Sequence, residues 1–176
     1  MDDSTRIEET EQGLVVRARR GDREAFGALY ARHAGALYAL ALRLVDDASL
    51  AEDLVQDTFL KALQTLGGYR GEAPLRAWLK RVTTHLAIDR LRARRPAVDL
   101  DAVSMVSPEP GPESQGSALG LLARIPVPAR TVVWLHTMEG WSHAEIGARF
   151  GMSESWSKSL VSRALARLRG VLEDGS

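Results

Sequence analysis

Residues 142–169 have the pattern of a helix, a tight turn and a second helix, and this pattern constrains the fold more than any other part of the 176-residue chain. Ser142 and Glu145 have the spacing of a capping box, which begins a helix. Gly151 stands where the turn needs a residue that accepts a positive φ, and Ser153 can cap the second helix. The second helix carries four basic residues: Lys158, Arg163, Arg167 and Arg169. A helix held in this way fits the major groove of DNA, and an ordinary helical hairpin in a bundle is the alternative.

The net charge of zero conceals a strong segregation of charge along the chain. Residues 76–95 hold seven basic residues and one acid, a local balance of +6, which suits phosphate binding. Residues 96–117 hold four acids and no base, and four of the seven prolines. Such a composition is typical of an extended linker between folded domains.

Apolar residues recur at spacings of three and four before this linker, which predicts amphipathic helices. Asp22 is expected to begin the first long helix. Its apolar stripe consists of Phe26, Leu29, Tyr30, His33, Leu37, Leu40 and Leu44. Ser49 and Glu52 have the spacing of a second capping box. The stripe that follows consists of Leu54, Val55, Thr58, Phe59, Ala62, Leu63 and Leu66.

Glycines and prolines mark the remaining helix ends. Gly67 and Gly68 end the second helix, Pro74 fits the first turn of the third, and Pro96 stops it. The buried face expected for the third helix is Leu75, Trp78, Leu79, Val82, Leu86 and Leu91. After the linker we expect a short helix with Leu119, Leu121 and Leu122. A second helix after Pro126 should turn four residues inward: Val132, Val133, Leu135 and Met138.

The sequence therefore predicts an all-α protein of two small helical domains joined by a flexible linker, since no strand pattern of useful length occurs. Residues 1–21 form a polar segment and a short helix, and residues 22–95 form the first domain. The acidic, proline-rich linker covers residues 96–117. Residues 118–173 form the second domain, which contains the helix-turn-helix.

Several functional classes are excluded by composition. The absence of cysteine excludes disulfides and Cys-ligated zinc, and suits a reducing cytoplasm. The four histidines lie at scattered positions, so we expect no metal site and no cofactor. No catalytic constellation is found, and we expect no enzyme. The acidic start lacks the apolar segment of a signal peptide, and the apolar run 37–45 is too short to span a membrane, so we expect no membrane contact.

Three segments in order resemble the bacterial extracytoplasmic-function (ECF) sigma factors of the sigma-70 family: residues 51–63, 69–95 and 151–169. The resemblance extends from about Ala25 to Leu172 and follows the family order of region 2, linker and region 4. It implies an alternative sigma factor that binds core RNA polymerase through the β′ clamp helices and the β subunit, and recognises the −10 and −35 promoter elements. It also implies an anti-sigma factor as a partner.

Polymerase binding is expected on the second helix. Four polar residues lie at helical spacing beside its apolar stripe: Asp53, Gln56, Asp57 and Lys61. The alternative is an ordinary solvated face. The resemblance implies that this face docks on the β′ clamp helices, where its acidic and amide groups can pair with basic groups.

Binding of the −10 element is expected on the loop after this helix and on the third helix. Tyr69 and Arg70 lie on a glycine-flanked loop, where an aromatic ring can stack on an unpaired base. The alternative for Tyr69 is that it closes the domain core, which is also expected of Trp78. Four residues of the third helix can follow phosphates: Arg76, Lys80, Arg81 and His85. Relatives often have Asn in place of His85, which puts the −10 base preference in doubt.

Binding of the −35 element is expected from five residues of the helix-turn-helix: Arg149, Lys158, Ser159, Ser162 and Arg163. Trp156 and Ser157 stand where relatives usually have Thr and Val, and Leu160 replaces a common Arg. Trp156 either fills the core or meets DNA, and the missing arginine is expected to weaken the grip on phosphates. Two alternative functions stay open: a conventional helix-turn-helix DNA-binding regulator, and a sigma-like decoy that binds polymerase without reading promoters.

Overall fold

The computed structural model describes residues 10–93 and 125–174, and every regular element within these two ranges is helical. This confirms the predicted all-α fold class. The linker predicted at 96–117 lies outside the described residues. The same holds for the predicted short helix with Leu119, Leu121 and Leu122, and for Arg94, Arg95 and Pro96.

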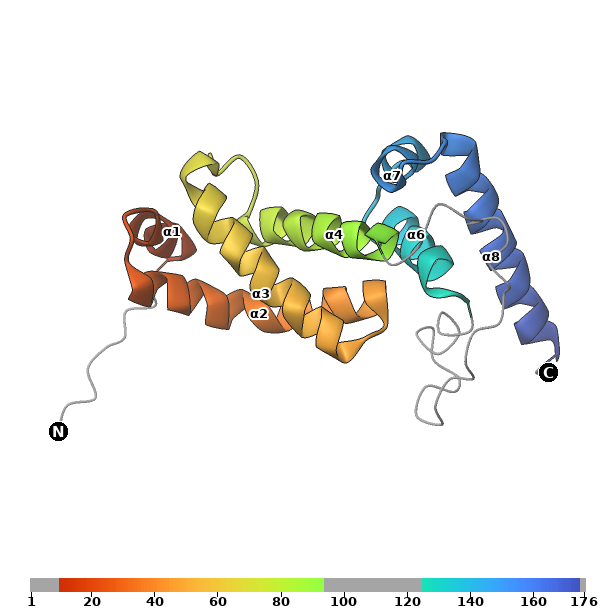
Figure 1. The fold of residues 1–176 in the computed structure, drawn as a ribbon, viewed down its shortest axis with the longest axis horizontal. Helices are drawn as coiled ribbons and strands as arrows, with labels where there is room; N and C mark the ends of the chain where they lie inside the picture. The colour runs from red at the N-terminus through yellow and green to blue at the C-terminus, as the bar shows by residue number, and fades with distance from the viewer. Residues whose placement is uncertain (1–9, 94–124, 175–176) are drawn as a thin grey trace. The chain divides into compact units, whose positions relative to one another are not determined.

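The chain divides into two compact units of helices (Figure 1). The described residues of the first unit lie within Met1–Leu42 and Ala48–Leu86, and those of the second within Arg43–Asp47 and Ala87–Ser176. The elements wholly or mainly in the first unit are α1 (Glu11–Arg19), α2 (Arg23–Val45), α3 (Ala48–Thr65), the 3-10 helix η1 (Leu66–Gly68) and α4 (Leu75–Ala93). The second unit contains α6 (Val127–Thr137), α7 (His143–Phe150) and α8 (Glu154–Asp174).

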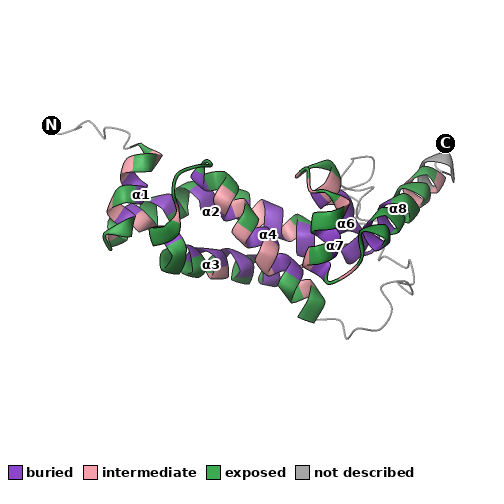
Figure 2. Ribbon diagram, turned by 90° about the horizontal axis from the view of Figure 1, so that it is seen from above, coloured by how far each residue is buried: buried purple, intermediate pink, exposed green. Residues whose placement is uncertain are grey.

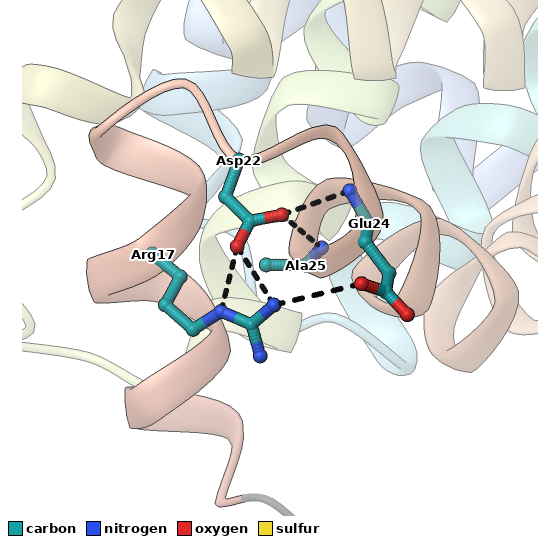
Figure 3. A network of polar contacts seen from close by, with 4 residues as sticks. All are labelled: Arg17, Asp22, Glu24 and Ala25. Carbon is teal, nitrogen blue, oxygen red and sulfur yellow. Dashed lines mark hydrogen bonds and ion pairs between the residues drawn. The ribbon is translucent and has the colours of Figure 1, made fainter.

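Asp22 caps the start of α2, as predicted, and its carboxylate also pairs with the last turns of α1 (Figure 3). Its Oδ1 accepts hydrogen bonds from the backbone N–H groups of Glu24 and Ala25, at 3.0 and 3.1 Å. Its Oδ2 lies 2.7 Å from both Nε and Nη2 of Arg17. The hydrogen bond from Ala25, followed by the contact with Arg17, lowers the pKa of Asp22 below its usual value. One carboxylate thus links two consecutive helices.

The starts of α3 and α4 differ from the predicted ones. Because α3 begins at Ala48, Ser49 lies inside the helix, and the capping box predicted with Glu52 is wrong. Pro74 stands just before α4, and its carbonyl accepts two backbone hydrogen bonds from the first turn, at 2.9 and 3.2 Å. A proline suits this end of a helix, because the missing N–H would have no partner within the helix.

One apolar core joins all the helices of the first unit. Its buried residues are Leu14, Val15, Ala18, Ala25, Leu29, Leu37, Val55, Phe59, Ala62, Leu66, Leu75 and Leu79. Along each helix buried and exposed residues alternate, as amphipathic packing requires (Figure 2). His33 is buried at the edge of this core, and its Nε2 lies 2.8 Å from Oε2 of Glu11. The prediction that Tyr30 is buried is wrong: it is 41% exposed, and its ring lies beside Phe59.

The core of the second unit lies between α6, α7 and α8. Val132, Val133 and Leu135 of α6 are buried, as predicted. Met138 is 63% exposed, contrary to the prediction. It follows the last residue of α6, so it no longer continues the buried side of that helix.

Candidate functional site

An exposed side of α3 carries the four residues predicted to bind polymerase. Asp53, Gln56 and Lys61 are exposed, and Asp57 is half-buried. The other side of α3 is buried: Leu50, Ala51, Leu54, Val55, Thr58, Phe59 and Ala62. Thr58 anchors this side to α4, since its Oγ1 lies 3.0 Å from Oγ1 of Thr83. The common exposed face is therefore present, and its function stays a prediction.

Two leucines on the exposed side of α3 were not foreseen as part of this face. Leu60 is 59% exposed and Leu63 is 53% exposed, so the prediction that Leu63 is buried is wrong. Leu60 follows Gln56 by four residues and Leu63 follows it by seven, which places both leucines on the side of the helix that carries Gln56. Their angular position on the helix lies outside the arc of the buried residues, and this signal could have identified them as exposed. We define the docking face as Asp53, Gln56, Asp57, Leu60, Lys61 and Leu63.

An open hollow of about 350 Å³ lies beside the docking face, between α2 and α3. Its lining consists of Tyr30, Ala34, Gly35, Tyr38, Glu52, Val55 and Gln56. The lining is mostly apolar, and Glu52 and Gln56 bring polar groups to it. Such a hollow can accept a single apolar side chain of a partner.

The loop between η1 and α4 holds Tyr69 against the core. Its ring lies 5.4 Å from the ring of half-buried Trp78, and its hydroxyl donates a hydrogen bond to the carbonyl of Ala73, at 2.5 Å. Burial raises the pKa of Tyr69, and the nearby Glu11 raises it further. Of the two alternatives for Tyr69, this geometry favours closure of the core. Arg70 beside it is exposed, and its Nη1 lies 3.9 Å from Oε1 of Glu72.

The four predicted residues of α4 do not form a single row. Arg76 and Arg81 are exposed, and Lys80 and His85 are half-buried. At about 100° per residue, Arg76 lies close to Lys80, but Arg81 is turned about 140° from Arg76. The helix therefore presents two pairs, one of Arg76 and Lys80 and one of Arg81 and His85.

The turn of the helix-turn-helix has the predicted construction. Ser142 and Glu145 form a complete capping box at the start of α7. Gly151 ends α7 with φ of 71°, and Ser153 Oγ accepts a hydrogen bond from the N–H of Trp156, at 3.1 Å. Gly147 was not singled out from the sequence, although a Cβ there would lie 2.7 Å from the carbonyl oxygen of Ser153. This close approach sets how tightly the two helices pack.

The exposed side of α8 carries four of the five residues predicted to bind the −35 element: Lys158, Ser159, Ser162 and Arg163. The other side is buried: Trp156, Ser157, Leu160, Val161 and Ala164. Lys158 pairs with Glu154 one turn earlier, at 2.6 Å. The hydrogen bond from Lys158 lowers the pKa of Glu154.

The unusual residues of α8 all belong to its buried side. Trp156 is 6% exposed and its ring lies 5.4 Å from that of Phe150, which decides for core filling. Leu160 is also buried, so it belongs to the packed side of α8, and the weaker grip on phosphates expected from the missing arginine stays a prediction. Ser157 is fully buried, and its Oγ lies 3.0 Å from Nδ1 of His143.

Arg149 differs from the other residues predicted to bind the −35 element. Its side chain is 29% exposed, and its Nη2 lies 2.7 Å from Oδ2 of Asp89, which belongs to the same unit. Its backbone carbonyl accepts a hydrogen bond from Arg92, at 3.2 Å. A phosphate contact by Arg149 therefore competes with an existing ion pair.

The described ranges contain neither a group of metal-binding side chains nor a helix that could span a membrane. Within residues 10–93 and 125–174, no three His, Asp or Glu side chains are grouped to hold a metal ion. None of the helices in these ranges has both the length and the apolar character of a membrane span.

Family models match most of the chain. Residues 29–96 match Sigma-70 region 2, and residues 116–168 match Sigma-70 region 4. RNA polymerase sigma factor NccH of Alcaligenes xylosoxydans xylosoxydans is 32% identical, over 93% of this chain and 95% of NccH. ECF RNA polymerase sigma factor SigM of Mycobacterium tuberculosis is 33% identical, over 97% of this chain and 90% of SigM.

Two solved structures share the fold. CnrH, in complex with the cytosolic domain of CnrY, is 27% identical with a TM-score of 0.51, over 94% of this chain and 99% of CnrH. RpoE from Bartonella quintana, in complex with the anti-sigma factor NepR, is 27% identical with a TM-score of 0.52, over 84% of this chain and 96% of RpoE.

Proposed function

Because the chain belongs to the sigma-70 family, in its ECF group, and is an alternative sigma factor that directs RNA polymerase to promoters, we propose which of its surfaces perform each task. The docking face of α3 binds the β′ clamp helices of core polymerase. The loop after α3, together with α4, binds the −10 element. The exposed side of α8 binds the −35 element. In this division region 2 covers residues 22–95 and region 4 covers residues 118–173, joined by the linker at 96–117.

The division of α8 into two sides carries the −35 proposal. Lys158, Ser159, Ser162 and Arg163 are exposed, and Trp156 and Leu160 on the other side fasten the helix to its unit. A recognition helix requires such an arrangement, because its DNA side must be exposed while its own packing holds it in place. Arg163 can bind guanine through two hydrogen bonds or hold a phosphate.

The docking face combines charge with exposed apolar area. Its acidic residues set the orientation of a basic partner surface. Leu60 and Leu63 supply apolar surface, which loses its contact with water when the partner binds. The hollow beside Gln56 offers room for one partner side chain. Binding energy in protein interfaces is concentrated in a few such apolar contacts.

We also infer how the protein acts in the cell. The protein supplies no catalysis of its own, because polymerase performs the chemistry. It acts in the cytoplasm, where polymerase works. It is held inactive by an anti-sigma factor, by analogy with RpoE bound to NepR.

Paired substitutions test the assignment of surfaces. Leu60→Ala should weaken binding to core polymerase by about tenfold, and Val16→Ala serves as its control, because Val16 is also exposed but lies on α1. Arg163→Ala should leave binding to core polymerase unchanged and reduce discrimination of the −35 element by roughly tenfold. A conventional regulator would need only Arg163, and a decoy would need only the docking face. Equal effects of Leu60→Ala and Val16→Ala would contradict the docking face.

A further inference from the structure

The buried side of the helix-turn-helix contains a polar cluster that DNA binding by the exposed side does not use. His136 lies in the last turn of α6, His143 begins α7 and Ser157 lies in α8. The two imidazole rings stack, with centroids 4.0 Å apart and planes inclined by 25°. Nδ1 of His143 lies 3.0 Å from Oγ of Ser157, whose side chain is fully buried. Three helices thus meet at one group of polar side chains.

The hydrogen-bond partners decide where one proton lies. The carbonyl of Trp141, 2.9 Å from Nδ1 of His136, can only accept, so Nδ1 of His136 carries a proton. The hydroxyl of Ser157 can either donate to Nδ1 of His143 or accept from it. The cluster therefore holds together with both rings neutral. Charging both rings places two positive charges at stacking distance, and they repel each other.

The surroundings of His143 favour its neutral form. Burial is the largest cause that lowers the pKa of His143, followed by His136 and then by Lys158. Glu154 acts in the opposite direction, but it is paired with Lys158 at 2.6 Å. The unfolded chain therefore takes up this proton at a higher pH than the folded chain does. Stability from this site is present above pH 6.5 and is lost as the pH falls through the lower pKa of the folded state.

The other acids near the cluster are engaged elsewhere. Oε1 of Glu139, which follows α6, lies 3.4 Å from Nε1 of Trp134. Glu145 of α7 accepts hydrogen bonds from the N–H and the hydroxyl of Ser142 in the capping box, at 2.9 and 2.7 Å.

We propose that His136, His143 and Ser157 form a proton-sensitive lock that fixes α8 against α7, so that the chain discriminates a −35 element less well as the pH falls. The proposal rests on the proposed function of α8. His143 and Ser157 are positioning residues, because they act through the placement of their exposed neighbours on α8. Lys158 follows Ser157 directly in the chain, so a shift of the serine moves a residue of the DNA-facing side.

A fall in pH should reduce how well the chain discriminates a −35 element from other sequences, whereas total DNA binding should not decrease with it. Protonation adds positive charge, which strengthens the attraction to phosphates of any sequence. One proton limits the change in the discrimination ratio to about tenfold per pH unit. The unusual serine at 157 thus gains a role that an apolar residue at this position could not perform.

The first test is a titration of the histidine rings by NMR in the full-length chain. We expect His143 to titrate below 6.5, the ordinary value, and His136→Phe to bring its pKa closer to that value, because His136 is one of the groups that lower it. His136→Phe keeps an aromatic ring in the stack and removes its charge. Ser155→Ala is the matched control, because Ser155 is an exposed serine of the same helix, and it should leave the titration unchanged.

The second test measures discrimination directly. Its probes are a −35 duplex recovered from a promoter library transcribed by core polymerase with this protein, and the same duplex with the element scrambled. Between pH 7.5 and 5.5, the ratio of the two affinities should fall for the natural chain and for Ser155→Ala. The fall should be smaller for Ser157→Ala and His136→Phe.

The results separate the lock from the function on which it rests. A pKa of His143 at the ordinary value, insensitive to His136→Phe, overturns the lock. A lowered pKa combined with a discrimination ratio that does not change with pH overturns its coupling to DNA reading. If the library yields no promoter, the proposed function fails, and the titration still decides whether the lock exists.

Discussion

Asp22 and Ser157 show how single polar side chains hold helices together in this protein. Asp22 caps α2 and pairs with Arg17 of α1, so its charge contributes to two helices. Ser157 is buried in α8 and lies beside His143 of α7. Sequence spacing predicted the cap at Asp22, because a cap depends on near neighbours. The partner of Ser157 could not be predicted, because it lies fourteen residues away across a turn.

The charge of Asp22 should make its contribution depend on pH. Its pKa is lowered in the folded state, so its stabilisation is present above about 3.8 and is lost as the pH falls through the lower pKa of the folded state. Asp22→Asn keeps a capping side chain but loses the charge toward Arg17, and we expect a lower unfolding midpoint at pH 7. Denaturant unfolding from pH 7 to 3 checks this. Glu72→Gln, whose side chain is 78% exposed on the loop before α4, is the control. A deficit that is the same at every pH would contradict the assignment to charge.

Leu160 tests which side of α8 is buried. Because Leu160 is 4% exposed, Leu160→Ala should lower the free energy of unfolding by about 2–5 kcal/mol, through lost burial and a cavity. Leu165→Ala on the same helix should cost less, because Leu165 is 36% exposed. Chemical denaturation of both variants provides the measurement. Equal costs would mean that the buried side of α8 has been assigned incorrectly.

At the scale of elements, the helix periods and the caps of α2, α7 and α8 agree with the sequence, whereas the capping box expected at Ser49 and Glu52 does not form. The helix-turn-helix was predicted with both caps and its Gly151, since these signals are local. Errors arose where burial depends on distant partners: Tyr30, Leu63 and Met138 were expected inside and are exposed. The docking face was incomplete for the same reason. The periodicity of an apolar stripe does not determine how wide the buried side of the helix is.

The packing of α7 against the turn depends on Gly147. Gly147→Ala places a Cβ within 3.0 Å of the backbone of Met152 and Ser153, which cannot move aside as a flexible side chain can. We expect a loss of about 1–3 kcal/mol in the free energy of unfolding. Gly170→Ala on α8 meets nothing within 4 Å, and it should stabilise the helix by about 0.5–1 kcal/mol. Thermal unfolding of the two variants should therefore shift in opposite directions, and a shift in the same direction would contradict this packing.

At the scale of the whole molecule, the order of the motifs was more informative than any one motif. A helix-turn-helix alone left a conventional regulator open. The region 2 pattern before it, with a linker between, indicated the family that the region 2 and region 4 matches confirm. The two-unit organisation serves a protein that must meet polymerase and two promoter elements. The base preferences lie beyond sequence reasoning, because they depend on contacts made only with DNA.

The most direct test is transcription by bacterial core polymerase on a pooled promoter library, with and without this protein. We expect transcripts that depend on the protein and share a −35 and a −10 element at a constant spacing. Arg163→Ala should relax the −35 consensus and leave the −10 consensus in place. Polymerase binding without any selected promoter would contradict promoter recognition, and the absence of both binding and selection would contradict the account as a whole.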